Sequence, residues 1–167
     1  MIRTVDEIPQ PGELICESVT RGHSRLLTNV VAPGLAIGVT DHIPALISNG
    51  WHCVVLAENF QPTAAQARYV KCVPLIDDGG NPRVRIIEAL EAVATTDLRY
   101  SRVAIVCRLG ESRSVAIACG FLAVSKAART MSEALEAIRE NRPEANPSWR
   151  LFQDVRKVVK ETQQFQD

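Results

Sequence analysis

Short apolar stretches alternate with longer segments of helical periodicity along most of this chain. The apolar stretches predict buried strands over 35–39, 51–56, 69–76 and 103–106. Between and after them, apolar residues recur every three or four positions, which predicts amphipathic helices. Because strands and helices alternate, we expect an α/β fold with a central, mostly parallel sheet. Functional sites in such sheets lie at the carboxyl ends of the strands.

Local signals predict where several helices begin and end. Asp41 is a candidate N-cap for the first helix, and Asn49-Gly50 is expected to end it. Thr130 and Glu133 have the spacing of a capping box, which predicts the start of a later helix.

One helix is expected to lie inside the core. It begins at Ser114, and its segment from Val115 to Val124 contains no polar side chain apart from the weakly polar Cys119. A helix that is apolar all round needs cover on every side. The other helices each have one apolar face, with these residues expected to point inward: Ile86, Ile87, Leu90, Val93, Ala94, Met131, Ala134, Leu135, Ile138, Leu151, Phe152, Val155, Val158 and Val159.

The first thirty residues have the weakest pattern. They contain Pro9, Pro11 and a polar stretch at 21–24. We expect residues 1–30 to form an N-terminal extension, either a strand pair or an arm, and residues 31–167 to form one domain.

Charge and composition exclude several classes of protein. Nineteen Lys and Arg balance nineteen Asp and Glu, so the net charge is zero and there is no basic excess for nucleic acid or an anionic membrane. The longest run without a strongly polar side chain, 115–124, is far shorter than the roughly twenty residues of a membrane-spanning helix. The N-terminus has no apolar signal core, so nothing predicts export.

The cysteines predict neither a disulfide framework nor a metal site. The five are Cys16, Cys53, Cys72, Cys107 and Cys119, an odd number with irregular spacing and no Cys-x-x-Cys pair. The three histidines make no metal-ligand spacing with them. We therefore expect a reducing, cytoplasmic setting and no metal or other cofactor.

The segment that indicates chemistry runs from Cys107 to Arg113. Five residues separate the two, a spacing that is weak by itself. Its context strengthens it, because the segment follows a β-branched strand, precedes the buried helix and contains Gly110, which permits a tight wrap of the backbone. Amide groups at a helix N-terminus then converge on one point, which suits a dianion and favours a thiolate at Cys107.

Two side chains beside this loop fit the same chemistry. Arg113 offers a planar fork that matches two phosphate oxygens, and Ser114 is placed to donate a hydrogen bond to the thiolate. A cysteine that attacks phosphorus also needs a proton donor for the leaving oxygen. Asp77 and Asp78 follow a predicted strand and precede Gly79-Gly80, so either can supply that proton from a mobile loop, or both are simply turn residues.

At these residues the sequence resembles the dual-specificity protein phosphatase family, the cysteine-dependent phosphatases with a Cys-x5-Arg loop. The matching stretches are 33–38, 73–77, 103–114 and 134–147, in the family's order and at its spacing. The resemblance implies a mostly parallel sheet with helices on both faces, an active-site loop between a central strand and a buried helix, and a catalytic domain over 31–167. It also implies that no metal is needed.

The resemblance implies a role for each residue of the loop. Cys107 matches the nucleophile that forms a phosphocysteine, and Arg113 matches the arginine that binds phosphate and stabilises the transition state. Asp77 matches the general acid that later activates water, and Ser114 matches the hydroxyl that assists breakdown of the intermediate. The phosphate would be held by the backbone of the five residues between the cysteine and the arginine: Arg108, Leu109, Gly110, Glu111 and Ser112.

The implied substrate is a phosphorylated protein or peptide, chiefly phosphotyrosine and also phosphoserine or phosphothreonine. The loop has only Arg108 and Arg113 as cations and also contains Glu111. That charge is low for a polyphosphorylated lipid or an RNA 5′ end, so those substrates rank below phosphorylated proteins.

Two departures from the family leave other interpretations open. Val106 stands where the family has a histidine that orders the loop, and Leu109 stands where a small residue is usual. The absence of that histidine at Val106 keeps open the interpretation that the protein binds phosphate without hydrolysing its ester. A rhodanese-like sulfurtransferase or rhodanese-fold phosphatase would also place a cysteine loop before a helix, but sixty residues follow Cys107, more than that fold needs.

Overall fold

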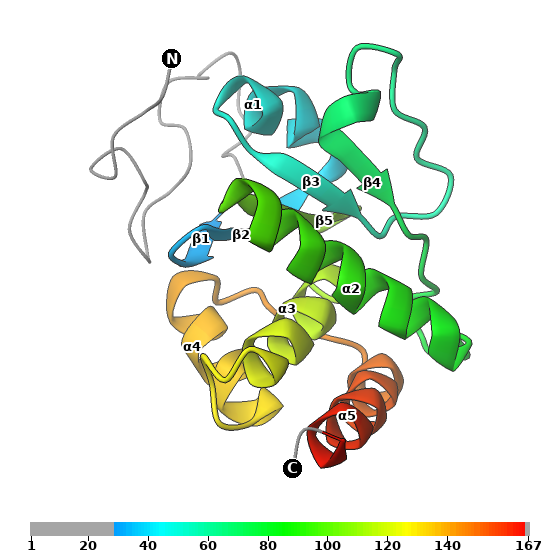
Figure 1. Ribbon diagram of the computed structural model, residues 1–167, viewed down its shortest axis with the longest axis vertical. Coiled ribbons are helices and arrows are strands. Elements are labelled where there is room, and N and C mark those ends of the chain that lie inside the picture. Colours follow the sequence, from blue (N-terminus) through cyan, green and yellow to red (C-terminus); the bar gives the residue numbers. More distant parts are fainter. Residues whose placement is uncertain (1–28, 166–167) are drawn as a thin grey trace.

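The core of the protein is a five-stranded sheet in the order β1-β2-β5-β3-β4 (Figure 1). The computed structural model describes residues 29–165, so the expected N-terminal extension lies almost wholly outside the described residues. β1 is antiparallel to β2, and all other neighbours are parallel. The strands are β1 (Asn29–Ala32), β2 (Leu35–Val39), β3 (His52–Val55), β4 (Val70–Cys72) and β5 (Val103–Cys107).

Helices cover both faces of this sheet, which confirms the α/β fold class (Figure 1). α1 packs on one face, α2 and α3 pack on the other, and α4 and α5 lie against α3. The helices are α1 (Ile43–Ser48), α2 (Arg83–Tyr100), α3 (Arg113–Val124), α4 (Met131–Asn141) and α5 (Trp149–Gln164).

The central strand β5 divides its side chains between two apolar cores. Successive side chains of a strand point to opposite faces. Ile105 and Cys107 therefore join the large core under α2 to α5, whereas Ala104 and Val106 join the smaller core under α1. This alternation fixes the direction of Cys107 toward α3 and of Val106 away from it.

The buried helix is confirmed as α3. Its residues are buried from Ser114 to Gly120 because β5, α2, α4 and α5 surround it. Thr130 is the N-cap of α4 as expected, since the Glu133 amide donates to Thr130 Oγ1 at 3.1 Å. The Glu133 carboxylate completes the turn differently from a capping box, because it accepts from the Arg129 amide at 3.0 Å. All five residues of α5 that were expected to face the core are buried: Leu151, Phe152, Val155, Val158 and Val159.

Two expectations about the helices were wrong in detail. A 3-10 turn over Thr40–His42 precedes α1, and α1 has no side-chain cap, so Asp41 is not its N-cap. Ala94 is exposed and Ala89 is buried in its place, because the inward stripe of α2 passes through Ile86, Ala89 and Val93.

The strand expected over 69–76 is shorter than its apolar run. β4 ends at Cys72, although the extended chain beyond it still pairs with the end of β3: the Val73 amide donates to Val55 O at 2.9 Å and the Leu75 amide to Leu56 O at 3.0 Å. Those bonds bring the chain to the carboxyl edge of the sheet just before Asp77.

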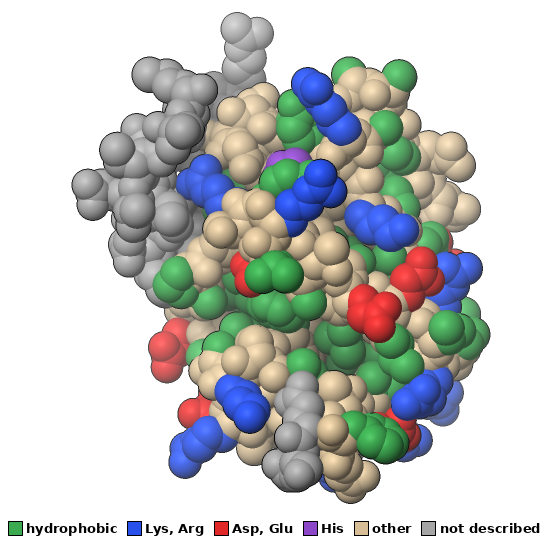
Figure 2. All heavy atoms as spheres, in the orientation of Figure 1, with side chains coloured by type: hydrophobic (Ala, Val, Ile, Leu, Met, Phe, Trp, Pro, Cys, Tyr) green, Lys and Arg blue, Asp and Glu red, His purple; other side chains and the backbone are tan. Residues whose placement is uncertain are grey.

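The face of the molecule drawn in Figure 2 is not dominated by charge of one sign. On the face drawn in Figure 2, basic and acidic side chains are interspersed, as the zero net charge suggests. Within 29–165 no helix is long and apolar enough to cross a membrane.

Candidate active site

Cys107 lies at the carboxyl end of the central strand, where α/β proteins place their functional groups. The chain then wraps through 108–112 and enters α3 at Arg113. A cleft of about 450 Å³ opens over this loop. Its lining residues come from the loop, the segment after β4 and the α4–α5 connection: Asp77, Cys107, Arg108, Leu109, Glu111, Ser112, Arg113, Asn146 and Ser148.

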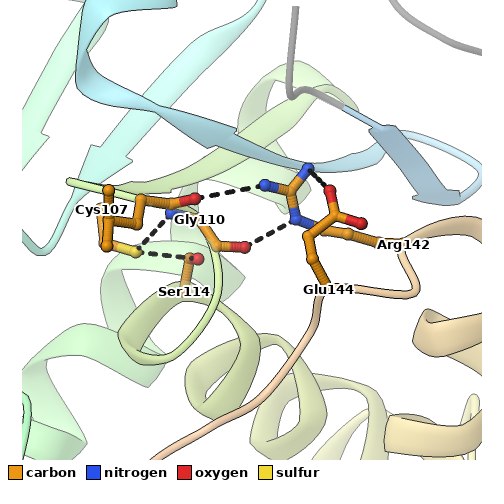
Figure 3. Close-up of polar contacts among 6 residues, drawn as sticks. Cys107, Gly110, Ser114, Arg142 and Glu144 are labelled. Atoms are coloured by element: carbon orange, nitrogen blue, oxygen red, sulfur yellow. Dashed lines mark hydrogen bonds and ion pairs between the residues drawn. The ribbon is translucent and has the colours of Figure 1, made fainter.

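Two hydrogen-bonding groups converge on the Cys107 sulfur (Figure 3). The Gly110 amide donates to Sγ at 3.2 Å, and the Ser114 hydroxyl oxygen lies 3.1 Å from it. Only 2% of Cys107 is exposed, and Ser114 is fully buried. An amide and a hydroxyl aimed at one sulfur stabilise its negative form, so this arrangement suits a thiolate.

Gly110 has a conformation and a neighbour that exclude other residues. Its φ is +65°, in the left-handed region. A Cβ added there would lie 2.5 Å from a guanidinium nitrogen of Arg142 and 3.2 Å from Gly38 O. The loop can therefore approach Arg142 this closely only because residue 110 has no side chain.

The sequence analysis missed Arg142, which is the chief anchor of the loop. Its Nε donates to Gly110 O at 2.6 Å, and a terminal nitrogen lies 3.4 Å from Leu109 O. The side chain is fully buried, and its charge is balanced by Glu144 at 3.5 Å. Figure 3 shows Gly110 between the Cys107 sulfur and Arg142.

Burial and nearby charges act in opposite directions on Arg142. Burial lowers the pKa of its guanidinium, whereas attraction to Glu144, Cys107 and Glu111 raises it. Arginine stays protonated under such conditions. The loop therefore has a permanent cation behind its backbone, at the C-terminal end of α4.

The connection between α4 and α5 holds the rest of the loop. The Asn146 amide donates to Glu111 O at 2.8 Å, and the Ser148 amide donates to Ser112 Oγ at 2.8 Å. No spacing in the sequence indicates these contacts, because they join groups more than thirty residues apart.

Arg113 ties the loop to the neighbouring segment. Its Nη1 donates to Leu75 O at 3.1 Å and lies 3.8 Å from Glu58 Oε1. Only 11% of the Arg113 side chain is exposed, and it still lines the cleft. Glu58, which follows β3, was not among the expected site residues.

The structure gives Asp77 and Asp78 different surroundings. Asp77 lines the cleft together with Cys107. Asp78 is turned to α5, where its Oδ1 lies 3.5 Å from the Ser148 hydroxyl. The base of this loop is closed by Asn81, whose side chain accepts from the Ile76 amide at 2.7 Å and donates to Ile76 O at 2.8 Å.

The other described cysteines are poor nucleophiles. Cys53 and Cys119 are buried, and burial raises the pKa of each thiol to about 12. Burial also raises the pKa of Cys72. These thiols stay neutral near pH 7, and all described cysteines are free. Cys16 lies outside the described residues.

Val106 stands where the family has a histidine, and its side chain points away from the active-site loop. It is fully buried with Ile43 and Trp51 in the core under α1. Its carbonyl accepts from the Leu56 amide at 2.8 Å, which continues the sheet. Here the loop is ordered from the other side, by Arg142 and the α4–α5 connection.

Within residues 29–165, no group of three or more His, Cys, Asp and Glu side chains is placed to hold a metal ion. The residues that line the cleft form hydrogen bonds to the loop and present two arginines and two acids. Their arrangement suits a phosphate group held by amides and guanidinium groups.

Comparison with known proteins points to one group. No protein-family model matches the sequence. The dual specificity protein phosphatase 1 of Arabidopsis thaliana is 26% identical over 121 residues, which are 70% of this chain and 61% of that protein. This chain thus spans about three-fifths of the length of that curated relative.

Solved structures agree on the fold. The crystal structure of human DUSP28 matches with a TM-score of 0.72 and 20% identity, covering 84% of this chain and 97% of that one. The human tyrosine phosphatase-like serine/threonine/tyrosine-interacting protein matches with a TM-score of 0.68 and 16% identity, covering 80% and 96%. The chain has the fold of the dual-specificity phosphatases, and the resemblance predicted from its four sequence stretches is confirmed.

Proposed function

We propose that this protein hydrolyses phosphate monoesters through a phosphocysteine intermediate. The observation that supports this most is the Cys107 sulfur, bonded by the Gly110 amide and the Ser114 hydroxyl at the end of the central strand. It faces a cleft that also holds Arg113 and Asp77. A nucleophile, a phosphate-binding fork and an acid then share one site.

In the first step the Cys107 thiolate attacks phosphorus. An S–P bond forms, the ester P–O bond breaks, and the leaving oxygen takes the proton of Asp77. The backbone of 108–112 and the Arg113 guanidinium hold the phosphoryl oxygens and stabilise the charge that spreads over them in the transition state.

In the second step water hydrolyses the phosphocysteine. Asp77, now a carboxylate, takes a proton from the attacking water. The S–P bond breaks and inorganic phosphate is released. The sulfur recovers its negative charge, which the Ser114 hydroxyl stabilises by donating a hydrogen bond, so Ser114 assists the sulfur as leaving group.

The proposed substrates are phosphotyrosine and, with it, phosphoserine or phosphothreonine in proteins. Arg108 and Arg113 are the cations of the cleft, and Asp77 and Glu111 oppose them. That balance suits one phosphate better than several. A cytoplasmic setting belongs to the same proposal, since it keeps Cys107 reduced.

Hydrolysis of p-nitrophenyl phosphate in EDTA tests the proposal. We expect turnover between about pH 5 and pH 8, and EDTA should not abolish it, because the proposed mechanism uses no metal. Vanadate should inhibit, because it mimics the transition state. Folded protein that binds inorganic phosphate without turnover would instead support a phosphate-binding protein, the interpretation that Val106 motivates. Transfer of sulfur from thiosulfate to cyanide would support the rhodanese-like interpretation.

Exchange of Asp77 for Asn should lower kcat on phenyl phosphate by about 100-fold, because phenolate leaves slowly without a proton. The loss should be smaller with p-nitrophenyl phosphate, whose leaving group needs less protonation. Asp78→Asn is the matched control, because Asp78 neighbours Asp77 in the sequence but is not among the residues that line the cleft. Equal losses of kcat in both variants would show that Asp77 is not the general acid. So would a loss in Asp77→Asn that is the same for phenyl phosphate and p-nitrophenyl phosphate.

A further inference from the structure

Three large apolar side chains that are exposed to solvent line the cleft or directly adjoin its lining residues in the sequence. Ile76 is 48% exposed, Leu109 is 60% exposed and Trp149 is 70% exposed. Leu109 lines the cleft, Ile76 directly precedes the lining residue Asp77, and Trp149 directly follows the lining residue Ser148. We call these three residues the apolar rim.

The three segments of the apolar rim are held together by polar contacts at their bases. Ser148 bonds the active-site loop through Ser112 and approaches Asp78 of the acid loop. Gly79 of the acid loop packs so closely on α5 that a Cβ there would lie 2.8 Å from the Cβ of Arg150. The three backbone segments that carry the rim residues are therefore held close to one another.

Neither folding nor the proposed chemistry accounts for the apolar rim. An exposed tryptophan contributes little to stability, and phosphate binding needs no leucine at 109. Tryptophan is the residue type most enriched among the side chains that dominate binding energy. Apolar groups beside a polar cleft are the usual design of a specificity site, in which the polar groups orient the ligand.

We infer that the apolar rim binds the substrate residues that flank the phosphorylated residue, so that the preferred substrate is a phosphoprotein segment with a large apolar side chain next to it. This inference rests on the proposed function. The occupant is a peptide in extended conformation. Side chains of an extended chain alternate in direction, so the phosphorylated residue can enter the cleft while its neighbours reach rim residues on separate segments. A phosphate entering the cleft brings its neighbours to the rim.

Two phosphotyrosine peptides that differ only in Leu or Ser beside the phosphorylated residue test the inference. We expect kcat/KM to be about tenfold higher for the Leu peptide, mainly through a lower KM, because one apolar side chain is buried on binding. Trp149→Ser should bring the ratio of the two kcat/KM values close to one. Leu98→Ser is the matched control, since Leu98 is 87% exposed on α2 and outside the rim.

Each other outcome has a defined meaning. A wild-type protein that hydrolyses both peptides equally, or a Trp149→Ser variant that keeps the preference, would overturn the inference while leaving the phosphatase proposal intact. If no substrate is hydrolysed, the proposed function fails, and calorimetric binding of the same two peptides still tests the rim. Trp149-dependent binding to phosphatidylinositol phosphate vesicles, without preference between the peptides, would overturn it in favour of a lipid surface.

Discussion

The Cys107→Ser variant should lose hydrolysis of p-nitrophenyl phosphate by at least about 10⁴-fold, because a serine hydroxyl is not ionised near neutral pH and attacks phosphorus poorly. The loop around it should stay intact. The serine oxygen can accept from the Gly110 amide and bond to Ser114 as the sulfur does. We therefore expect unchanged thermal unfolding and retained binding of inorganic phosphate.

Cys72→Ser is the control for this variant. Cys72 lies on the edge strand β4, is half-buried, and has a pKa that burial raises, so it should not serve as a nucleophile. Its exchange should leave turnover within about twofold of the wild type. Substantial vanadate-sensitive turnover in Cys107→Ser would mean that another group attacks the phosphate.

The strands and helices with strong local patterns could be predicted from the sequence. The strand at 35–39 matches β2, and the apolar run of 115–124 matches the buried helix α3. The strand over 69–76 was predicted too long, because its apolar run continues beyond the residues of β4 that pair with β3. β4 stops at Cys72 because the strand beside it, β3, ends at Val55, and only single bonds continue past that point.

The site was predictable only where its residues are neighbours in sequence. Cys107, Gly110, Arg113 and Ser114 belong to one turn between a strand and a helix, so the backbone itself brings them together. Glu58 and Arg142 reach the site from distant segments through side-chain geometry. Composition gave no sign of this, because a buried arginine and a surface arginine are identical in sequence.

Val106 illustrates the same limit. As a sequence departure it casts doubt on the order of the loop, because the family's histidine supports that order. In the structure its side chain points into the α1 core, and the loop carbonyls are bonded by Arg142 on the opposite side. Valine at position 106 thus removes one group that could order the loop, but Arg142 orders it instead. The spacing of residues in the sequence does not indicate that contact.

Arg142 should therefore matter both for stability and for the reactivity of Cys107. Arg142→Met leaves the Gly110 and Leu109 carbonyls without their donor and leaves Glu144 without its partner. We expect the free energy of unfolding to fall by about 3 kcal/mol, which corresponds to about 10 °C in Tm for a domain of this size. A loop displaced by about 1 Å should also lower kcat about 100-fold.

Reactivity of the thiolate separates this positioning role from a merely structural one. Arg142 holds Gly110, whose amide bonds the sulfur, so the alkylation profile of Cys107, its time course with iodoacetate at one fixed pH, should be slower in Arg142→Met. Arg142→Lys keeps the charge without the planar fork and should recover part of the alkylation profile but less of the Tm. Glu144→Gln leaves the bonds of Arg142 to the loop carbonyls in place and should change kcat little. An Arg142→Met variant that unfolds at lower temperature but keeps the wild-type alkylation profile would show that Arg142 holds the fold and does not act on the cysteine.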